Sequence, residues 1–118
     1  MTVGRGHFQL AVPQTMNPLA HPTDVLMAQL SEGALSSAEL TRACLDEIAA
    51  HDAQVGSFLH VVGDEALSMA ADVDRRRRAG EPLGPVAGLP IAIKDVLCTT
   101  DQPTTCGSRM LSGWTPPY

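Results

Sequence analysis

The residue in this sequence best suited to carry out chemistry is Lys94. It is the only lysine beside seven arginines, and it ends the apolar run of residues 89–93. A lysine at the end of an apolar strand is partly desolvated, which disfavours its ammonium form. The neutral amine could then act as a general base or form a Schiff base. The alternative, which the local sequence alone favours, is a structural lysine that reaches solvent or pairs with an acid.

Asp95 follows Lys94 directly and would be its simplest partner. Adjacent residues of a strand face opposite ways, so we expect Asp95 to anchor the following turn instead. That turn leads into residues 99–108, which are rich in hydroxyl groups. The hydroxyls could bind a polar substrate or cap their own backbone, and the self-capped loop is the favoured interpretation. Cys106 lies in this loop without a nearby histidine to activate it as a nucleophile.

The other titratable residues predict no metal site. The four histidines show neither metal-ligand spacing nor pairing. The three cysteines fit no zinc pattern, and we expect reduced thiols. Four arginines, residues 75–78, fall in the last turn of an expected helix, where cations complement the helix dipole. A nucleic-acid patch is the less favoured interpretation of these arginines.

Local signals predict three helices. The first covers residues 23–32, with Thr23 as N-cap and Gly33 as terminator, and it places Leu26 and Leu30 on one face. The second begins at a capping box formed by Ser36 and Glu39 and runs to about His51. Its expected buried stripe is Leu40, Cys44 and Ile48. The third is capped by Asp64 and ends near residues 79–80, with a shared face made of Ala66, Met69, Ala70 and Val73.

Two further segments, residues 57–62 and 89–94, have the composition of strands. Neither alternates polar with apolar residues, so both are expected to be buried on two faces in a sheet flanked by helices. The predicted fold class is therefore α/β, with a mixed sheet. Two strands cannot make such a sheet stable. We therefore expect an incomplete domain: a flexible leader over residues 1–21, then the N-terminal portion of a domain over residues 22–118.

Composition excludes several classes of protein. With 118 residues, 44% hydrophobic and 18% charged, the chain is neither a disordered tail nor a membrane span. Its net charge of −5 argues against a free-standing nucleic-acid binder, but not against a subunit whose partner holds the nucleic acid. No signal peptide is expected, because Pro13 interrupts the only apolar stretch near the N-terminus. The predicted location is cytoplasmic.

Several strings of the sequence resemble those of amidase-signature enzymes. Residues 88–95, Gly-Leu-Pro-Ile-Ala-Ile-Lys-Asp, are similar to the segment that carries the catalytic lysine of that family. Residues 104–111, Thr-Thr-Cys-Gly-Ser-Arg-Met-Leu, and residues 116–118, Pro-Pro-Tyr, resemble the A subunits of aspartyl/glutamyl-tRNA amidotransferases more than general amidases. Residues 33–41 are typical of the family's first helices. The resemblance covers about residues 23–118.

The resemblance implies a mechanism based on two serines and a lysine. Lys94 matches the family lysine, which accepts a proton through a bridging serine while a second serine attacks an amide carbonyl and ammonia leaves. Both serines and the glycine-rich loop of the family are expected beyond Tyr118. No nucleophile is carried over to the serines present, which include Ser36, Ser37, Ser57, Ser68, Ser108 and Ser112. A base without nucleophile and oxyanion donors cannot transfer an acyl group, so we expect the chain alone to be inactive.

The resemblance also implies partners. Glutamine would be the substrate, and B and C subunits would complete the enzyme. The B subunit would use ATP and magnesium to amidate Glu-tRNA(Gln) or Asp-tRNA(Asn), and no cofactor is expected in this chain. Two alternatives stay open: a general amidase acting on small carboxamides, and a non-catalytic module that completes a partner's sheet. The substrate-binding residues are not predicted.

Overall fold

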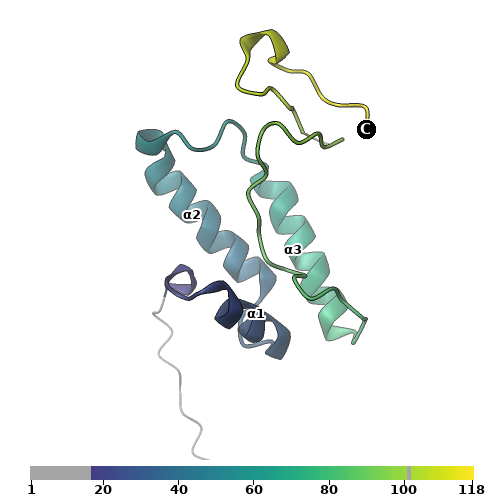
Figure 1. The fold of residues 1–118 in the computed structure, drawn as a ribbon. Coiled ribbons are helices and arrows are strands. Elements are labelled where there is room, and N and C mark those ends of the chain that lie inside the picture. The colour runs from purple at the N-terminus through teal and green to yellow at the C-terminus, as the bar shows by residue number, and fades with distance from the viewer. Residues whose placement is uncertain (1–16, 101) are drawn as a thin grey trace, which may run out of the picture.

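A computed structural model describes residues 17–100 and 102–118 of the chain. The elements in these residues are η1 (Pro18–Ala20), α1 (Thr23–Glu32), α2 (Ser37–Val55), α3 (Gly63–Arg78) and η2 (Arg109–Leu111). The helices α2 and α3 pack side by side and run in opposite directions, and α1 lies against the first turns of α2 (Figure 1). None of the described helices is both long and apolar enough to span a bilayer.

The first helix, α1, ends at Glu32 as predicted but begins one residue earlier than predicted, because Thr23 is its first helical residue. Pro22 is the N-cap and makes no side-chain bond, so the proposed cap at Thr23 is wrong. Gly33 ends the helix as predicted, with φ of 73°, a left-handed conformation that glycine adopts without steric cost. Leu26 and Leu30 are both buried, as their spacing predicts.

The capping box at the start of α2 is confirmed. The Glu39 N–H donates to the Ser36 hydroxyl at 3.1 Å, and the Ser36 N–H donates to the Glu39 carboxylate at 2.9 Å. The helix continues past the predicted end at His51 to Val55, because no helix-breaking residue precedes Gly56, which takes φ of 67°. In the predicted stripe Leu40 is buried, whereas Cys44 and Ile48 are only half-buried.

The third helix, α3, starts two residues earlier than predicted. It runs from Gly63 with Val62 as an N-cap that makes no side-chain bond, so Asp64 lies in the first turn instead of capping it. Ala70 on the predicted face is buried, but Met69 is 70% exposed. The helix packs on α2, and its one buried residue is the small Ala70.

The core is small and lies where α1 meets α2. It consists of Leu26, Leu30 and Leu40, with further leucines packed against it from flanking segments: Leu19, Leu35 and Leu89. Leu19 belongs to η1, which packs on α2. The predicted flexible leader, residues 1–21, lies largely outside the described residues. Its last part, from Asn17 onward, is folded onto the helices instead.

Neither of the two predicted strands is paired with another segment. No strand or bridge occurs within residues 17–100 and 102–118, so the expected mixed sheet is not formed in the described part of the chain. A strand needs a hydrogen-bonded neighbour, and a two-stranded sheet is marginal even when paired. Apolar side chains of both segments are consequently exposed, such as Leu59 at 67% and Ile91 at 76%, whereas Leu89 packs against the core.

Candidate functional site around Lys94

The segment that leads to Lys94 is tied to the helices by a polar network centred on Asp74. Its carboxylate, on α3, accepts hydrogen bonds from the backbone N–H groups of Ser37 at 2.8 Å and Ala38 at 3.0 Å. The first N–H groups of a helix have no partner inside it, so the start of α2 requires such acceptors. Asp74 thereby joins the last turns of α3 to the first turn of α2.

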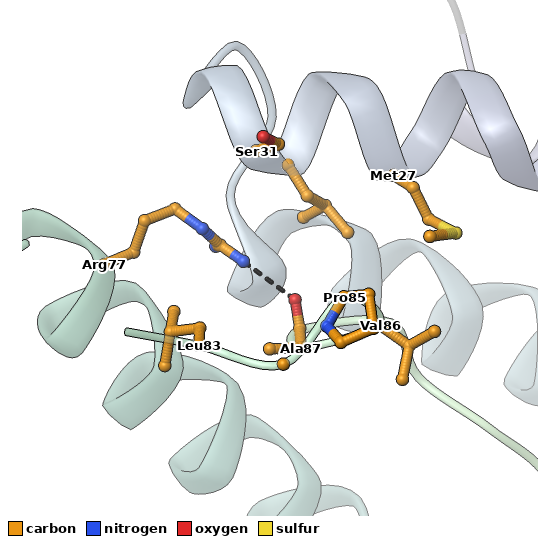
Figure 2. A pocket seen from close by; sticks show the side chains of 9 residues that line it. Met27, Ser31, Arg77, Leu83, Pro85, Val86 and Ala87 are labelled. Carbon is orange, nitrogen blue, oxygen red and sulfur yellow. Dashed lines mark hydrogen bonds between the residues drawn. The ribbon is translucent and has the colours of Figure 1, made fainter. Parts of the chain in front are cut away.

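The same network holds the turn before Lys94. The buried Ser37 hydroxyl donates to the Gly88 carbonyl at 2.8 Å. Arg77 donates to the Ala87 carbonyl at 2.7 Å, and Figure 2 shows its side chain reaching from α3 to that oxygen. Gly88 has φ of 92°, and a Cβ there would lie 3.1 Å from the Ser37 side chain. Only glycine fits this turn without displacing its neighbours.

A hollow of about 190 Å³ lies between α1 and the segment after α3. The side chains drawn in Figure 2 come from α1, from the end of α3 and from residues 83–87. Arg77 lies at its edge, where the guanidinium is already engaged by Ala87 and by Asp74 at 3.4 Å. Neither Lys94 nor Asp95 lines this hollow. It is a packing gap behind the network, separate from the predicted catalytic residue.

Lys94 itself is exposed, as are Ile91 and Ile93 before it. The predicted desolvation of the lysine is therefore wrong for the described part of the chain. The reason is the missing sheet: the apolar residues before Lys94 have no neighbouring strand to cover them. Lys94 remains the predicted catalytic residue on its sequence position, and burial of its amine would have to come from other parts of an enzyme.

Asp95 anchors the following turn, as predicted. Its carboxylate accepts from the Thr105 N–H at 2.8 Å, from the Thr105 hydroxyl and from the Gly107 N–H at 3.2 Å. Its carbonyl accepts from the Cys106 N–H at 2.9 Å. The hydrogen bonds from the Thr105 hydroxyl and N–H, with a smaller contribution from Gly107, hold the pKa of Asp95 below its usual value.

The hydroxyl-rich loop caps itself, which confirms the favoured interpretation. Thr104 is 2% exposed; its hydroxyl donates to the Leu97 carbonyl at 3.3 Å and its N–H to the Trp114 carbonyl at 3.1 Å. The Ser108 hydroxyl accepts from the Met110 N–H at 3.3 Å. These side chains hydrogen-bond to backbone groups of their own loop. The Thr104 hydroxyl is buried and is not accessible to a substrate.

The four arginines at the end of α3 are engaged locally. Arg75 pairs with Asp72, and Arg76 pairs with Glu81 at 2.8 Å. Arg78 donates to the carbonyl of Asp74 at 3.2 Å, in its own helix. Because each guanidinium bonds a neighbouring carboxylate or carbonyl, the interpretation as a helix terminus is favoured over a nucleic-acid patch.

The cysteines form no disulfide among the described residues. Cys44 is half-buried in α2, and burial raises the pKa of its thiol, which makes it a poor nucleophile. Cys98 and Cys106 are exposed. Within residues 17–100 and 102–118, no three His, Cys, Asp or Glu side chains lie close enough together to hold a metal ion.

Sequence reasoning missed the network of Asp74, Ser37 and Gly88. The one local signal was an acidic residue in the last turns of α3, where a carboxylate opposes the helix dipole. Its partners are 36 and 37 residues away, so no helical spacing connects them. The sequence places Gly88 only in a turn-rich stretch, without indicating what it contacts.

Comparison with known proteins agrees with the motif around Lys94. Residues 39–118 match the sequence profile of the family named Amidase. The chain is 54% identical over 98 residues to the A subunit of the glutamyl-tRNA(Gln) amidotransferase of Mycolicibacterium vanbaalenii, a match covering 79% of this chain and 20% of the relative. The relative of the same name from Salinispora arenicola is 56% identical over 93 residues, covering 79% of this chain and 19% of the relative.

A third relative of that name, from Mycobacterium tuberculosis strain H37Ra, is 54% identical over 94 residues, again with 79% and 19% covered. The chain thus spans about a fifth of the length of the curated relatives it matches. No solved structure matches it.

Proposed function

This chain belongs to the Amidase family, and we propose that it forms the lysine-bearing part of the A subunit of a glutamyl-tRNA(Gln) amidotransferase. The observation that carries the proposal is the identity of 54% over 79% of the chain with proteins of that name. The loop after Lys94 lies within the residues that match the family profile, and residues 104–111 resemble the A subunits more than general amidases. In this proposal the two extended segments, residues 57–62 and 89–94, become strands of a mixed sheet completed by the rest of the enzyme.

In the proposed reaction Lys94 is the general base. Its neutral amine takes a proton from a bridging serine, which in turn takes the proton of a second, nucleophilic serine. That serine attacks the side-chain amide carbon of glutamine. The proton then passes back to the amide nitrogen of glutamine, which leaves as ammonia. An acyl-enzyme remains and is hydrolysed to glutamate. A B subunit then uses the ammonia, with ATP and magnesium, to amidate Glu-tRNA(Gln) or Asp-tRNA(Asn), and a C subunit completes the complex.

The chain alone is proposed to be inactive. The hydroxyls nearest the start of α2 are already committed, because Ser36 donates to Glu39 and Ser37 donates to Gly88. No serine hydroxyl within the described residues hydrogen-bonds to Lys94. A base without an activated nucleophile and an oxyanion hole cannot transfer an acyl group.

A chimeric enzyme tests this proposal. In the chimera, this chain replaces the matching segment of the M. vanbaalenii relative, which is produced with the B and C subunits of that organism. We expect glutamine-dependent amidation of Glu-tRNA(Gln) close to that of the relative, and no ammonia from the 118-residue chain by itself.

Two results would overturn the proposal in different ways. A folded chimera that hydrolyses small carboxamides but fails to support amidation would indicate a general amidase. A folded chimera without either activity would show that this chain does not supply a working base, as expected of a non-catalytic module.

A further inference from the structure

We propose that Asp95 is the positioning residue for Lys94: it binds Thr105, Cys106 and Gly107 and so fixes the backbone from which the lysine side chain extends. The inference rests on the proposed function of Lys94. It adds to it a residue that acts through the lysine without touching substrate.

The first support is the number of bonds that converge on one residue. The Asp95 carboxylate accepts hydrogen bonds from the Thr105 N–H, the Thr105 hydroxyl and the Gly107 N–H. The Asp95 backbone carbonyl accepts a fourth, from the Cys106 N–H. Both ends of the loop are therefore closed by a single side chain and its own backbone. Hydrogen bonds to an ionised carboxylate are about twice as strong as neutral ones, so the bonds to Asp95 contribute most to holding the loop in place.

The second support is the backbone of Lys94 itself. Its carbonyl accepts from the Leu97 N–H at 2.9 Å, and the Leu97 carbonyl accepts from the buried Thr104 hydroxyl at 3.3 Å. The turn after Lys94 is thus tied to the locked loop, whereas the lysine side chain is exposed and free to extend. Such a side chain has many rotamers, so the position of its backbone decides where the amine can reach.

The third support is the conformation of the residues that donate to Asp95. Cys106 and Gly107 both have positive φ, 52° and 68°, which directs their successive N–H groups toward Asp95. A side chain with a Cβ is uncommon in this region and stays there only where the surroundings over-determine it. The hydrogen bonds to Asp95 hold Cys106 and Gly107 in this conformation. Without the carboxylate, the Cys106 N–H would keep the Asp95 carbonyl, but the Gly107 N–H would keep only the Thr105 hydroxyl at 3.2 Å as its acceptor.

The substitution Asp95→Asn in the chimera removes the negative charge and replaces one of the two acceptor oxygens by an NH₂ group, so that one amide oxygen is left for the three donors of Thr105 and Gly107. A misplacement of about 1 Å in a catalytic group can cost about a hundredfold in rate. We expect kcat for ammonia release from glutamine to fall about a hundredfold, with KM for glutamine changed less than about twofold. Asp46→Asn, on the exposed face of α2, is the matched control and should behave as the parent.

A double-mutant cycle separates positioning from general loss of structure. In a Lys94→Met background, Asp95→Asn should lower the residual rate no further, because a positioning residue acts only through the lysine. An equal fractional loss in both backgrounds would show that Asp95 is merely structural. Retention of full activity by Asp95→Asn would also overturn the proposal.

An inactive parent chimera would count against the proposed function alone. In that case hydrogen exchange still tests whether Asp95 holds the loop. The amides of Thr105 and Gly107 should be protected in the folded parent and should exchange at least about tenfold faster in Asp95→Asn, the loss expected when a bond to a charged group is removed. Unchanged protection in the variant would show that Asp95 does not lock the loop.

Discussion

The carboxylate of Asp74 caps the backbone of Ser37 across two helices, with an O–N distance of 2.8 Å. The same carboxylate reaches Ala38, so the start of α2 depends on a residue near the end of α3. The Asp74 side chain is only 14% exposed. Its removal would leave backbone donors without acceptors in a partly buried site, which is costly.

The first prediction follows from this contact. Asp74→Asn should lower the free energy of opening of the first turn of α2 by about 2 kcal/mol, within the range for hydrogen bonds to a charged group. Hydrogen exchange at Ser37 and Ala38 in the chimera measures it. The control is Asp72→Asn, whose pair with Arg75 is exposed and screened by solvent and should therefore contribute much less. Equal effects of the two substitutions would contradict the role assigned to Asp74.

The second prediction concerns Gly88. Gly88→Ala should destabilise the turn by about 1–3 kcal/mol, because alanine is strained at φ of 92° and its Cβ would meet the Ser37 side chain at 3.1 Å. Gly84→Ala is the control, since its Cβ would meet nothing within 4 Å and its φ is not positive. The denaturation midpoints of the two chimeras give the comparison. A Gly88→Ala variant as stable as Gly84→Ala would show that the turn adapts freely.

The third prediction concerns the pH dependence of the capping box. Bonds from the Ser36 backbone and then its hydroxyl lower the pKa of Glu39 from 4.5. A carboxyl whose pKa is lower in the folded state stabilises above its unfolded pKa, and this contribution is lost as pH falls through the folded pKa. Ser36→Ala should therefore cost about 1 kcal/mol at pH 7 and less below pH 4.5.

The measurement is urea denaturation of the Ser36→Ala chimera at several pH values, with Ser68→Ala, exposed in the middle of α3, as the control. A cost that stays constant with pH would mean that the hydroxyl contributes only its bond to the Glu39 N–H. The Ser36 substitution should leave ammonia release nearly unchanged.

The fourth prediction concerns the chain in isolation. Its core has few members, and residues 57–62 and 89–94 expose apolar side chains such as Leu59, Ile91 and Ile93, at 67%, 76% and 48%. Exposed apolar segments with unpaired backbone associate with one another. We expect the isolated chain to bind a hydrophobic dye, to aggregate at raised concentration and to unfold without a sharp transition. A monomer with a cooperative transition and sharp near-UV dichroism would contradict this expectation.

The helices could be predicted from sequence because their signals are local. The Ser36–Glu39 box and Gly33 mark helix ends within a few residues, and both are found where expected. The anchoring role of Asp95 was also predictable, since it followed from strand geometry and the hydroxyl-rich loop. In each case the residues that decide the structure lie close together in the chain.

The strands and the interhelical network could not be predicted in the same way. The apolar run before Lys94 has the composition of a buried strand, but burial depends on neighbouring strands that the described residues do not provide. The bond from Asp74 to Ser37 depends on how two helices dock, which no local pattern encodes. Lys94 is exposed because the neighbouring strands that would bury this run are not among the described residues.

The most direct test of the proposed role of Lys94 is the activity of Lys94→Arg in the chimera, measured as ammonia release from glutamine with folding checked by circular dichroism. Arginine keeps the charge and much of the volume, but its guanidinium stays protonated and accepts no proton from the bridging serine. Loss of a general base costs about 10²–10⁴ in rate, and Lys94→Met should be equally inactive while folded. We predict that the Arg variant retains less than about a hundredth of the parent rate. An Arg variant with more than about a tenth of that rate would show that Lys94 is not the base.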